Sequence, residues 1–118
     1  DHVLLHVVQL ARGIIRPPDI IGRYGGEEFL IGLVECEQAG ALQIAERIRL
    51  KIAQDQFVWE QQATVVTVSI GVVMLSPDID QVETLIARAD QAMYYAKRRG
   101  RNRVELYHEA CATKSQPK

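Results

Sequence analysis

The stretch Arg23-Tyr24-Gly25-Gly26-Glu27-Glu28-Phe29-Leu30 decides how the rest of this 118-residue chain is interpreted. Apolar residues precede it at Ile20-Ile21 and follow it in residues 29–34. Two apolar runs joined by adjacent glycines predict a β-hairpin with a tight turn at Gly25-Gly26, because glycine tolerates the positive φ that such turns need. Glu27 and Glu28 stand where an apolar strand is expected to resume. Two carboxylates beside a stiff turn are suited to holding a divalent cation or to accepting a proton.

Composition and charge are those of an ordinary globular domain. Apolar residues make up 47% and charged residues 25% of the chain, whose length is that of one domain. The formal net charge of −1 gives no overall attraction to nucleic acid or to a membrane, so a phosphorylated ligand would need local arginine and lysine clusters. The longest apolar run, in residues 65–75, is too short for a transmembrane helix. Cys36 and Cys111 have neither metal-ligand spacing nor a disulfide framework, so we expect a reduced, cytoplasmic setting.

Helical and strand patterns alternate along the chain. Helical spacing of apolar residues predicts helices over residues 1–15, 38–54 and 81–98, and β-branched runs predict strands over residues 20–25, 28–34, 57–59, 63–75 and 103–107. This order predicts an α/β fold, close to α+β, with a mixed central sheet that contains an antiparallel hairpin and is flanked by helices. Gly71 is expected at a bulge or a close backbone approach, and Gly100 is expected to end the last helix. We expect one domain over residues 1–107 and a frayed tail over residues 108–118.

The glycine–glutamate stretch resembles the signature of the GGDEF family, the diguanylate cyclases, in its GGEEF form. Residues 66–72 read V-T-V-S-I-G-V and residues 88–94 read R-A-D-Q-A-M-Y, and both are similar to further segments of that family. The resemblance covers the chain to about residue 106 and implies a nucleotide-cyclase-like fold. Taken alone, the stretch is equally compatible with a surface hairpin that carries two solvated glutamates.

The resemblance implies an enzyme that condenses two GTP into cyclic di-GMP and two pyrophosphates. In that family two domains meet as a homodimer and each holds one GTP, with Mg²⁺ or Mn²⁺ at the phosphates. Carried over to this chain, Glu27 is the metal ligand and general base, and Glu28 is a second metal contact. The residues implied to bind the substrate are Asp1 at the guanine, Gly25 and Gly26 at close backbone approaches, and Lys97 and Arg101 at the triphosphate.

A second site is implied by Arg16-x-x-Asp19, which resembles the RxxD motif at which the family binds cyclic di-GMP as a feedback inhibitor. Arg47 matches a further arginine of that inhibitory site. Guanidinium groups suit phosphate and guanine acceptors, which makes the assignment chemically sensible. The alternatives are an arginine at a helix end, an aspartate in a turn and a solvated arginine on a helix face, all of which are common.

The family's opening segments do not precede Asp1 in this chain. They include the first central strand of the sheet, with a metal-binding aspartate. We therefore expect the chain alone to be inactive, and its sheet to be completed either by strand exchange between two copies or by an upstream strand of a longer parent protein. The sensory input and any membrane anchor of such a parent stay open. A non-catalytic receptor for cyclic di-GMP, or an interaction module, is the alternative function.

Overall fold

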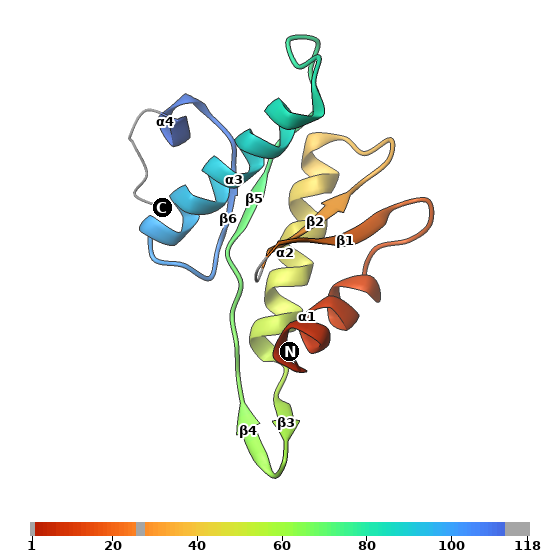
Figure 1. Ribbon diagram of the computed structural model, residues 1–118, viewed down its shortest axis with the longest axis vertical. Coiled ribbons are helices and arrows are strands. Elements are labelled where there is room, and N and C mark those ends of the chain that lie inside the picture. Colours follow the sequence, from red (N-terminus) through yellow and green to blue (C-terminus); the bar gives the residue numbers. More distant parts are fainter. Residues whose placement is uncertain (1, 26–27, 113–118) are drawn as a thin grey trace. The chain divides into compact units, whose positions relative to one another are not determined.

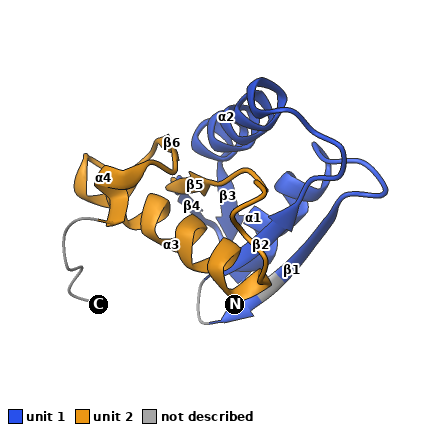
Figure 2. Cartoon of the chain, turned by 90° about the horizontal axis from the view of Figure 1, so that it is seen from above, with its two compact units in different colours: residues 1–66 blue, residues 67–118 orange. Residues whose placement is uncertain are grey.

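The computed structural model describes residues 2–25 and 28–112, and these divide into two units at residues 66 and 67 (Figure 2). The first unit holds α1, β1, β2, α2, β3 and β4, and the second holds β5, α3, β6 and α4. None of the helices among these described residues is long and apolar enough to cross a membrane.

Two helices supply the buried core of the first unit. Helix α1 (His2–Arg12) packs against α2 (Gln38–Gln54), as Figure 1 shows. The buried residues share a helical spacing, which turns one apolar stripe of each helix toward the other. They are Val7 and Ala11 of α1, and Ala41, Ala45, Ile48 and Ile52 of α2. The bounds predicted for the second helix are confirmed, whereas the first helix ends three residues earlier than predicted.

Two antiparallel hairpins complete the first unit. Strand β1 (Ile20–Gly25) pairs with β2 (Glu28–Gly32), as predicted. Strand β3 (Phe57–Trp59) pairs with β4 (Gln62–Thr64). The β3–β4 hairpin is held to α1 by aromatic contacts, since the rings of His2 and Trp59 stack with centroids 3.5 Å apart. The ring of His6 lies against that of Phe57 in a tilted arrangement, with centroids 4.7 Å apart, and its Nε2 is 2.9 Å from a carboxylate oxygen of Asp55.

The second unit is built on a parallel pair, β5 (Ile70–Val72) and β6 (Val104–Leu106), covered by α3 (Val82–Arg98). Strand β5 runs very close to α3. A Cβ on Gly71 would lie 2.3 Å from both the carbonyl oxygen of Ala89 and the backbone nitrogen of Met93. Ala92 and Ala96, the fully buried residues of α3, are small enough to permit this approach. The close backbone approach predicted at Gly71 is confirmed.

The loop before α3 is tied to that helix by an ion pair. Arg88 lies 3.1 Å from Asp78, and its guanidinium also lies over the ring of Tyr107, 5.3 Å from the centroid. The hydroxyl of Ser76 donates a hydrogen bond to Asp78. That bond, and then the one from Arg88, holds the pKa of the Asp78 carboxyl below its ordinary value.

The strands differ from the prediction in two ways. The expected strand over residues 63–75 is divided into β4 and β5, because β4 pairs with β3 while β5 pairs with β6, and residues 65–69 pair with neither. The expected central sheet is replaced, among the residues that the structure describes, by three two-stranded sheets. The absence of a first central strand stays a prediction.

The frayed tail expected from His108 is wrong for the residues that form α4 (Glu109–Ala112). This short helix packs on α3 and buries Cys111. The ring of His108 meets that of Tyr95 edge-on, with centroids 5.0 Å apart. Residues 113–118 lie outside the described part of the chain, and the domain boundary at residue 107 stays a prediction.

Candidate functional site

The β1–β2 hairpin places Glu28, the second residue of the acidic pair, at the end of a strand ladder. Gly25 pairs with Glu28, after an irregularity in the ladder between Arg23 and Gly25. The turn predicted at Gly25-Gly26 includes a residue that the structure does not describe, so it stays a prediction. Gly26 and Glu27 lie outside the described residues, as does Asp1.

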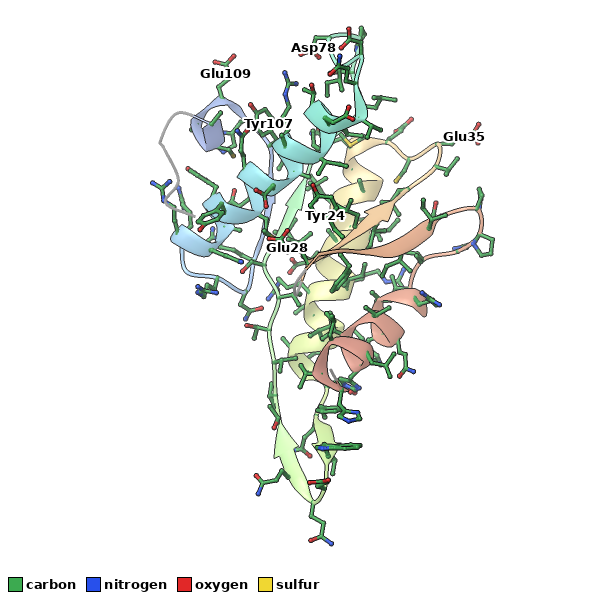
Figure 3. The ribbon with its side chains drawn as sticks, in the orientation of Figure 1. Tyr24, Glu28, Glu35, Asp78, Tyr107 and Glu109 are labelled. Carbon is green, nitrogen blue, oxygen red and sulfur yellow. The ribbon has the colours of Figure 1, made fainter. Side chains whose placement is uncertain are left out.

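Glu28 is the first residue of β2 and is half-buried (Figure 3). Within the described part of the chain its carboxylate makes no hydrogen bond and no ion pair. A carboxylate in that state fits the oxygen ligands that Mg²⁺ and Mn²⁺ prefer. The described residues contain no group of three acidic, histidine or cysteine side chains that could hold a metal. Glu28 thus fits a divalent cation as one ligand of a larger set.

Arg16 and Asp19 belong to one tight turn between α1 and β1. The backbone nitrogen of Asp19 donates to the carbonyl oxygen of Arg16 at 2.7 Å, across the cis bond Pro17-Pro18. The Asp19 carboxylate is already used on one side, because its Oδ1 accepts a hydrogen bond from the backbone nitrogen of Val34 at 2.9 Å. This bond ties the turn to the chain just after β2. Oδ2 remains available to a ligand, and the Arg16 side chain is exposed.

Arg47 lies on α2 with its side chain exposed. Among the described residues, no hydrogen bond or ion pair joins it to Arg16 or Asp19. Its neighbour Arg49 is engaged differently, since it forms an ion pair with Glu46 one helical turn earlier. The first unit therefore contains all three residues predicted for the inhibitory site and holds two of them in one turn.

Lys97 and Arg101 lie together at the carboxyl end of α3 in the second unit. The ammonium of Lys97 is 5.8 Å from the centroid of the Tyr94 ring. Arg99 is occupied, because it donates to the hydroxyl of Tyr95 at 3.0 Å and lies over that ring. The side chain of Arg101 is exposed and makes no hydrogen bond or ion pair within the described part of the chain. The exposed guanidinium of Arg101 is therefore available to an anion, as is that of Arg98.

Gly100 ends α3 as predicted, and the chain then continues through three successive residues with positive φ. The φ angles are 127° for Gly100, 63° for Arg101 and 50° for Asn102. The backbone nitrogen of Arg101 donates to the carbonyl oxygen of Ala96 at 3.0 Å, which satisfies a helix-end carbonyl. The sequence predicts the glycine but gives no signal for the two left-handed residues that follow.

Comparison with known proteins identifies the class to which this fold and these residues belong. The sequence profile of "Diguanylate cyclase, GGDEF domain" matches residues 1–103. The chain belongs to the GGDEF family of diguanylate cyclases.

Two curated relatives show how much of the protein this similarity covers. Diguanylate cyclase A of Treponema denticola is 37% identical over 106 residues, which is 90% of this chain and 29% of the relative. Diguanylate cyclase DosC of Escherichia coli K12 is 41% identical over 108 residues, which is 91% of this chain and 23% of the relative. The chain therefore spans about a quarter of the length of the curated relatives it matches.

Solved structures agree on the fold, which is nucleotide-cyclase-like. The GGDEF domain of YfiN (TpbB) from Pseudomonas aeruginosa superposes with a TM-score of 0.84 at 34% identity, covering 92% of this chain and 68% of that one. The GGDEF domain of DgcB from Caulobacter crescentus, solved in complex with c-di-GMP, superposes with a TM-score of 0.82 at 29% identity. It covers 88% of this chain and 62% of the solved chain.

Proposed function

We propose that this chain is the catalytic part of a diguanylate cyclase, which joins two GTP molecules into cyclic di-GMP and releases two pyrophosphates. The observation that carries the proposal is the closed β1–β2 ladder, in which Gly25 pairs with Glu28 around an intact G-G-E-E-F sequence. The family membership supports the same reaction. Each of two domains in a homodimer holds one GTP, and the 3′-hydroxyl of each GTP attacks the α-phosphate of the other.

The proposed roles follow from the chemistry of each side chain. Glu27 accepts the proton of the attacking hydroxyl and, with Glu28, holds a divalent ion, for which we propose Mg²⁺ or Mn²⁺. When bound, that ion supplies positive charge against the triphosphate. Gly25 and Gly26 carry no side chain that would keep a nucleotide from the backbone. Lys97 and Arg101 bind the phosphate chain as cations, and Asp1 binds the guanine.

The positive charge at the end of α3 is necessary for this assignment. The carboxyl end of a helix carries a partial negative charge, which disfavours an anion. Phosphate binding there must come from side chains, and the exposed Arg101 is placed just beyond the last turn. The proposal thus depends on Arg101 and Lys97 rather than on the helix itself.

The chain is proposed to act in the cytoplasm, where GTP is available, and to have little activity as the 118-residue piece. It covers 62–68% of the solved GGDEF domains named above. We also propose that the small sheets are extended either by strand exchange between two copies or by an upstream strand of a longer parent protein.

A non-catalytic receptor for cyclic di-GMP is the second candidate. It is favoured by the formed turn of Arg16 and Asp19, with Arg47 in the same unit. In an enzyme, the same three residues would act as a product-inhibition site. The intact glycine–glutamate sequence favours the enzyme, because a receptor has no use for the acidic pair.

The proposal is tested by giving GTP and Mg²⁺ to the full-length natural protein and to the 118-residue chain. We expect cyclic di-GMP and pyrophosphate from the full-length protein and almost none from the short chain, as measured by liquid chromatography. Calorimetry with cyclic di-GMP on both samples separates the candidates. Binding of cyclic di-GMP without any turnover in the full-length protein would favour the receptor, and the absence of any nucleotide binding would favour an interaction module.

A matched pair of variants at Asp19 separates its structural role from ligand binding. Asp19→Asn retains an oxygen that accepts from the Val34 amide, whereas Asp19→Ala loses it. We expect Asp19→Asn to keep the thermal stability of the wild type and to weaken cyclic di-GMP binding about tenfold, because a hydrogen bond to a charged group contributes about 1.5–3 kcal/mol. Asp19→Ala should weaken binding and also lower the melting temperature. Unchanged cyclic di-GMP affinity in Asp19→Asn would remove Asp19 from the proposed site.

A further inference from the structure

The segment after α3 holds Arg101 in a backbone conformation that arginine does not favour. Gly100 tolerates positive φ and asparagine adopts it more readily than most residues, as at Asn102 with φ of 50°, but Arg101 has φ of 63° with neither advantage. Residues in such conformations persist only where surrounding contacts hold them. The contacts that stabilise this backbone therefore also determine where the side chains of the segment are placed.

Contacts from both sides fix Arg101. Its own nitrogen donates to the carbonyl oxygen of Ala96 at 3.0 Å. The next backbone nitrogen, that of Asn102, donates to the hydroxyl oxygen of Ser69 at 3.2 Å. Ser69 is distant in the sequence and directly precedes β5, whose first residue, Ile70, donates in turn to the carbonyl oxygen of Arg103 at 3.0 Å. One side of the segment is thus held by α3 and the other by the approach to β5.

Arg103 adds a second brace to the same segment. Its guanidinium donates to the carbonyl oxygen of Arg99 at 3.0 Å and to the carboxylate of Glu105 at 3.2 Å. The Glu105 side chain is only 16% exposed, so this ion pair is partly shielded from water. The bridge runs across Gly100 and Arg101 and leaves the Arg101 side chain exposed. Arg101 thus combines a braced backbone with a side chain that can reach a ligand.

We infer that Ser69 is a positioning residue for the phosphate chain of GTP, acting through Arg101. This inference rests on the proposed function, in which Arg101 binds the triphosphate. The Ser69 hydroxyl accepts a hydrogen bond from the backbone nitrogen of Asn102, the residue after Arg101. This bond stabilises the left-handed backbone of Arg101 and so fixes the position from which the Arg101 side chain extends. A cation that is already placed loses less conformational entropy when it binds, which raises the affinity for the anion. The strand composition of residues 63–75 gives no sign of this role for Ser69.

The experiment measures the affinity of the full-length natural protein for the unreactive probe guanosine 5′-[α,β-methylene]triphosphate with Mg²⁺, by calorimetry. We expect Ser69→Ala to weaken binding about threefold to tenfold, because the net contribution of one hydrogen bond changes an equilibrium constant by about that factor. Ser69→Thr keeps the hydroxyl and should restore binding to within about twofold of wild type. The matched control is Thr67→Ala, which removes an exposed hydroxyl two residues away and should leave binding unchanged.

A double-mutant cycle supplies a readout that general destabilisation would not produce. If Ser69 acts through Arg101, Ser69→Ala should have no further effect on probe affinity in an Arg101→Ala background. An equal loss in both backgrounds, or wild-type affinity in Ser69→Ala alone, would overturn the inference while leaving the proposed role of Arg101 intact. Wild-type affinity in Arg101→Ala would instead refute that role in the proposed function, and the inference would fall with it.

Discussion

Replacing Gly71 with alanine is expected to destabilise the second unit severely. The added Cβ would lie 2.3 Å from the carbonyl oxygen of Ala89 and from the nitrogen of Met93, and 2.9 Å from the carbonyl carbon of Ala92. All three are backbone atoms of α3, so no side-chain rotation relieves the clash. Overpacking costs about 1–3 kcal/mol and occasionally more. We expect a loss of at least about 3 kcal/mol, because a whole helix must move away from β5.

Urea denaturation of both proteins, followed by circular dichroism, checks this expectation. The matched control is Gly22→Ala on β1, where an added Cβ would meet no atom within 4 Å. Gly22→Ala should leave the stability unchanged or raise it slightly, because alanine lowers the conformational entropy of the unfolded chain. Three of the four tyrosines, Tyr94, Tyr95 and Tyr107, lie in the second unit, whereas the one tryptophan, Trp59, lies in the first and reports on that unit. A wild-type midpoint in Gly71→Ala would contradict the close packing of β5 on α3.

Features set by local pattern were predictable from the sequence. The bounds of α2 follow from the spacing of its apolar stripe, and the β1–β2 hairpin follows from adjacent glycines between two apolar runs. Gly71 within a strand indicated either a bulge or a close backbone approach, of which the second is observed, and Gly100 indicated the end of α3. In each case the residues that determine the structure lie close to one another in the sequence.

Features that depend on distant partners were not predictable. Residues 63–75 have uniform strand composition, yet their pairing depends on β3 at one end and on β6 at the other. Helix α4 is too short to show a periodic pattern, and only its packing on α3 explains its order. Composition therefore predicts that a segment is extended without predicting which strand it joins.

The candidate site shows the same division. The motifs identified Arg16 and Asp19 as a pair, but the pattern gave no sign that one Asp19 oxygen is taken by the backbone of Val34. The motif indicated Lys97 but not its contact with the Tyr94 ring. It indicated Arg101 but not the hydrogen bond from the next residue, Asn102, to the hydroxyl of Ser69. Backbone donors and hydroxyl acceptors are present in nearly every segment, so only the folded chain shows which of them meet.

The largest functional effect is expected from Glu27→Gln in the full-length natural protein. Glutamine keeps the size of the side chain but removes its charge and its ability to accept the proton of the attacking hydroxyl. A positioned general base increases the rate of a reaction about 10²–10⁴-fold. We therefore expect the turnover of GTP to fall by at least about 10²-fold. Loss of a proposed metal ligand acts in the same direction. Chromatographic measurement of cyclic di-GMP formed per unit time gives the comparison.

The control for this substitution is Glu60→Gln, which makes the same chemical change in the turn between β3 and β4, at an exposed residue. It should leave the rate at the wild-type value. Glu28→Gln should be less damaging than Glu27→Gln, because Glu28 is proposed to support the metal and not to take the proton. Retention of more than a tenth of the wild-type rate by Glu27→Gln would refute the proposed base.

Glu27→Gln also separates the two candidate functions when cyclic di-GMP binding is measured in the same samples. The residues proposed for that ligand, Arg16, Asp19 and Arg47, do not include the acidic pair, so cyclic di-GMP affinity should be unchanged. An enzyme with product inhibition therefore loses turnover and keeps binding. A receptor has no turnover to lose, so it would show the same binding in both proteins and no product in either. The two functions differ in the wild type, where only the enzyme forms product, so this distinction does not depend on how well the variant folds.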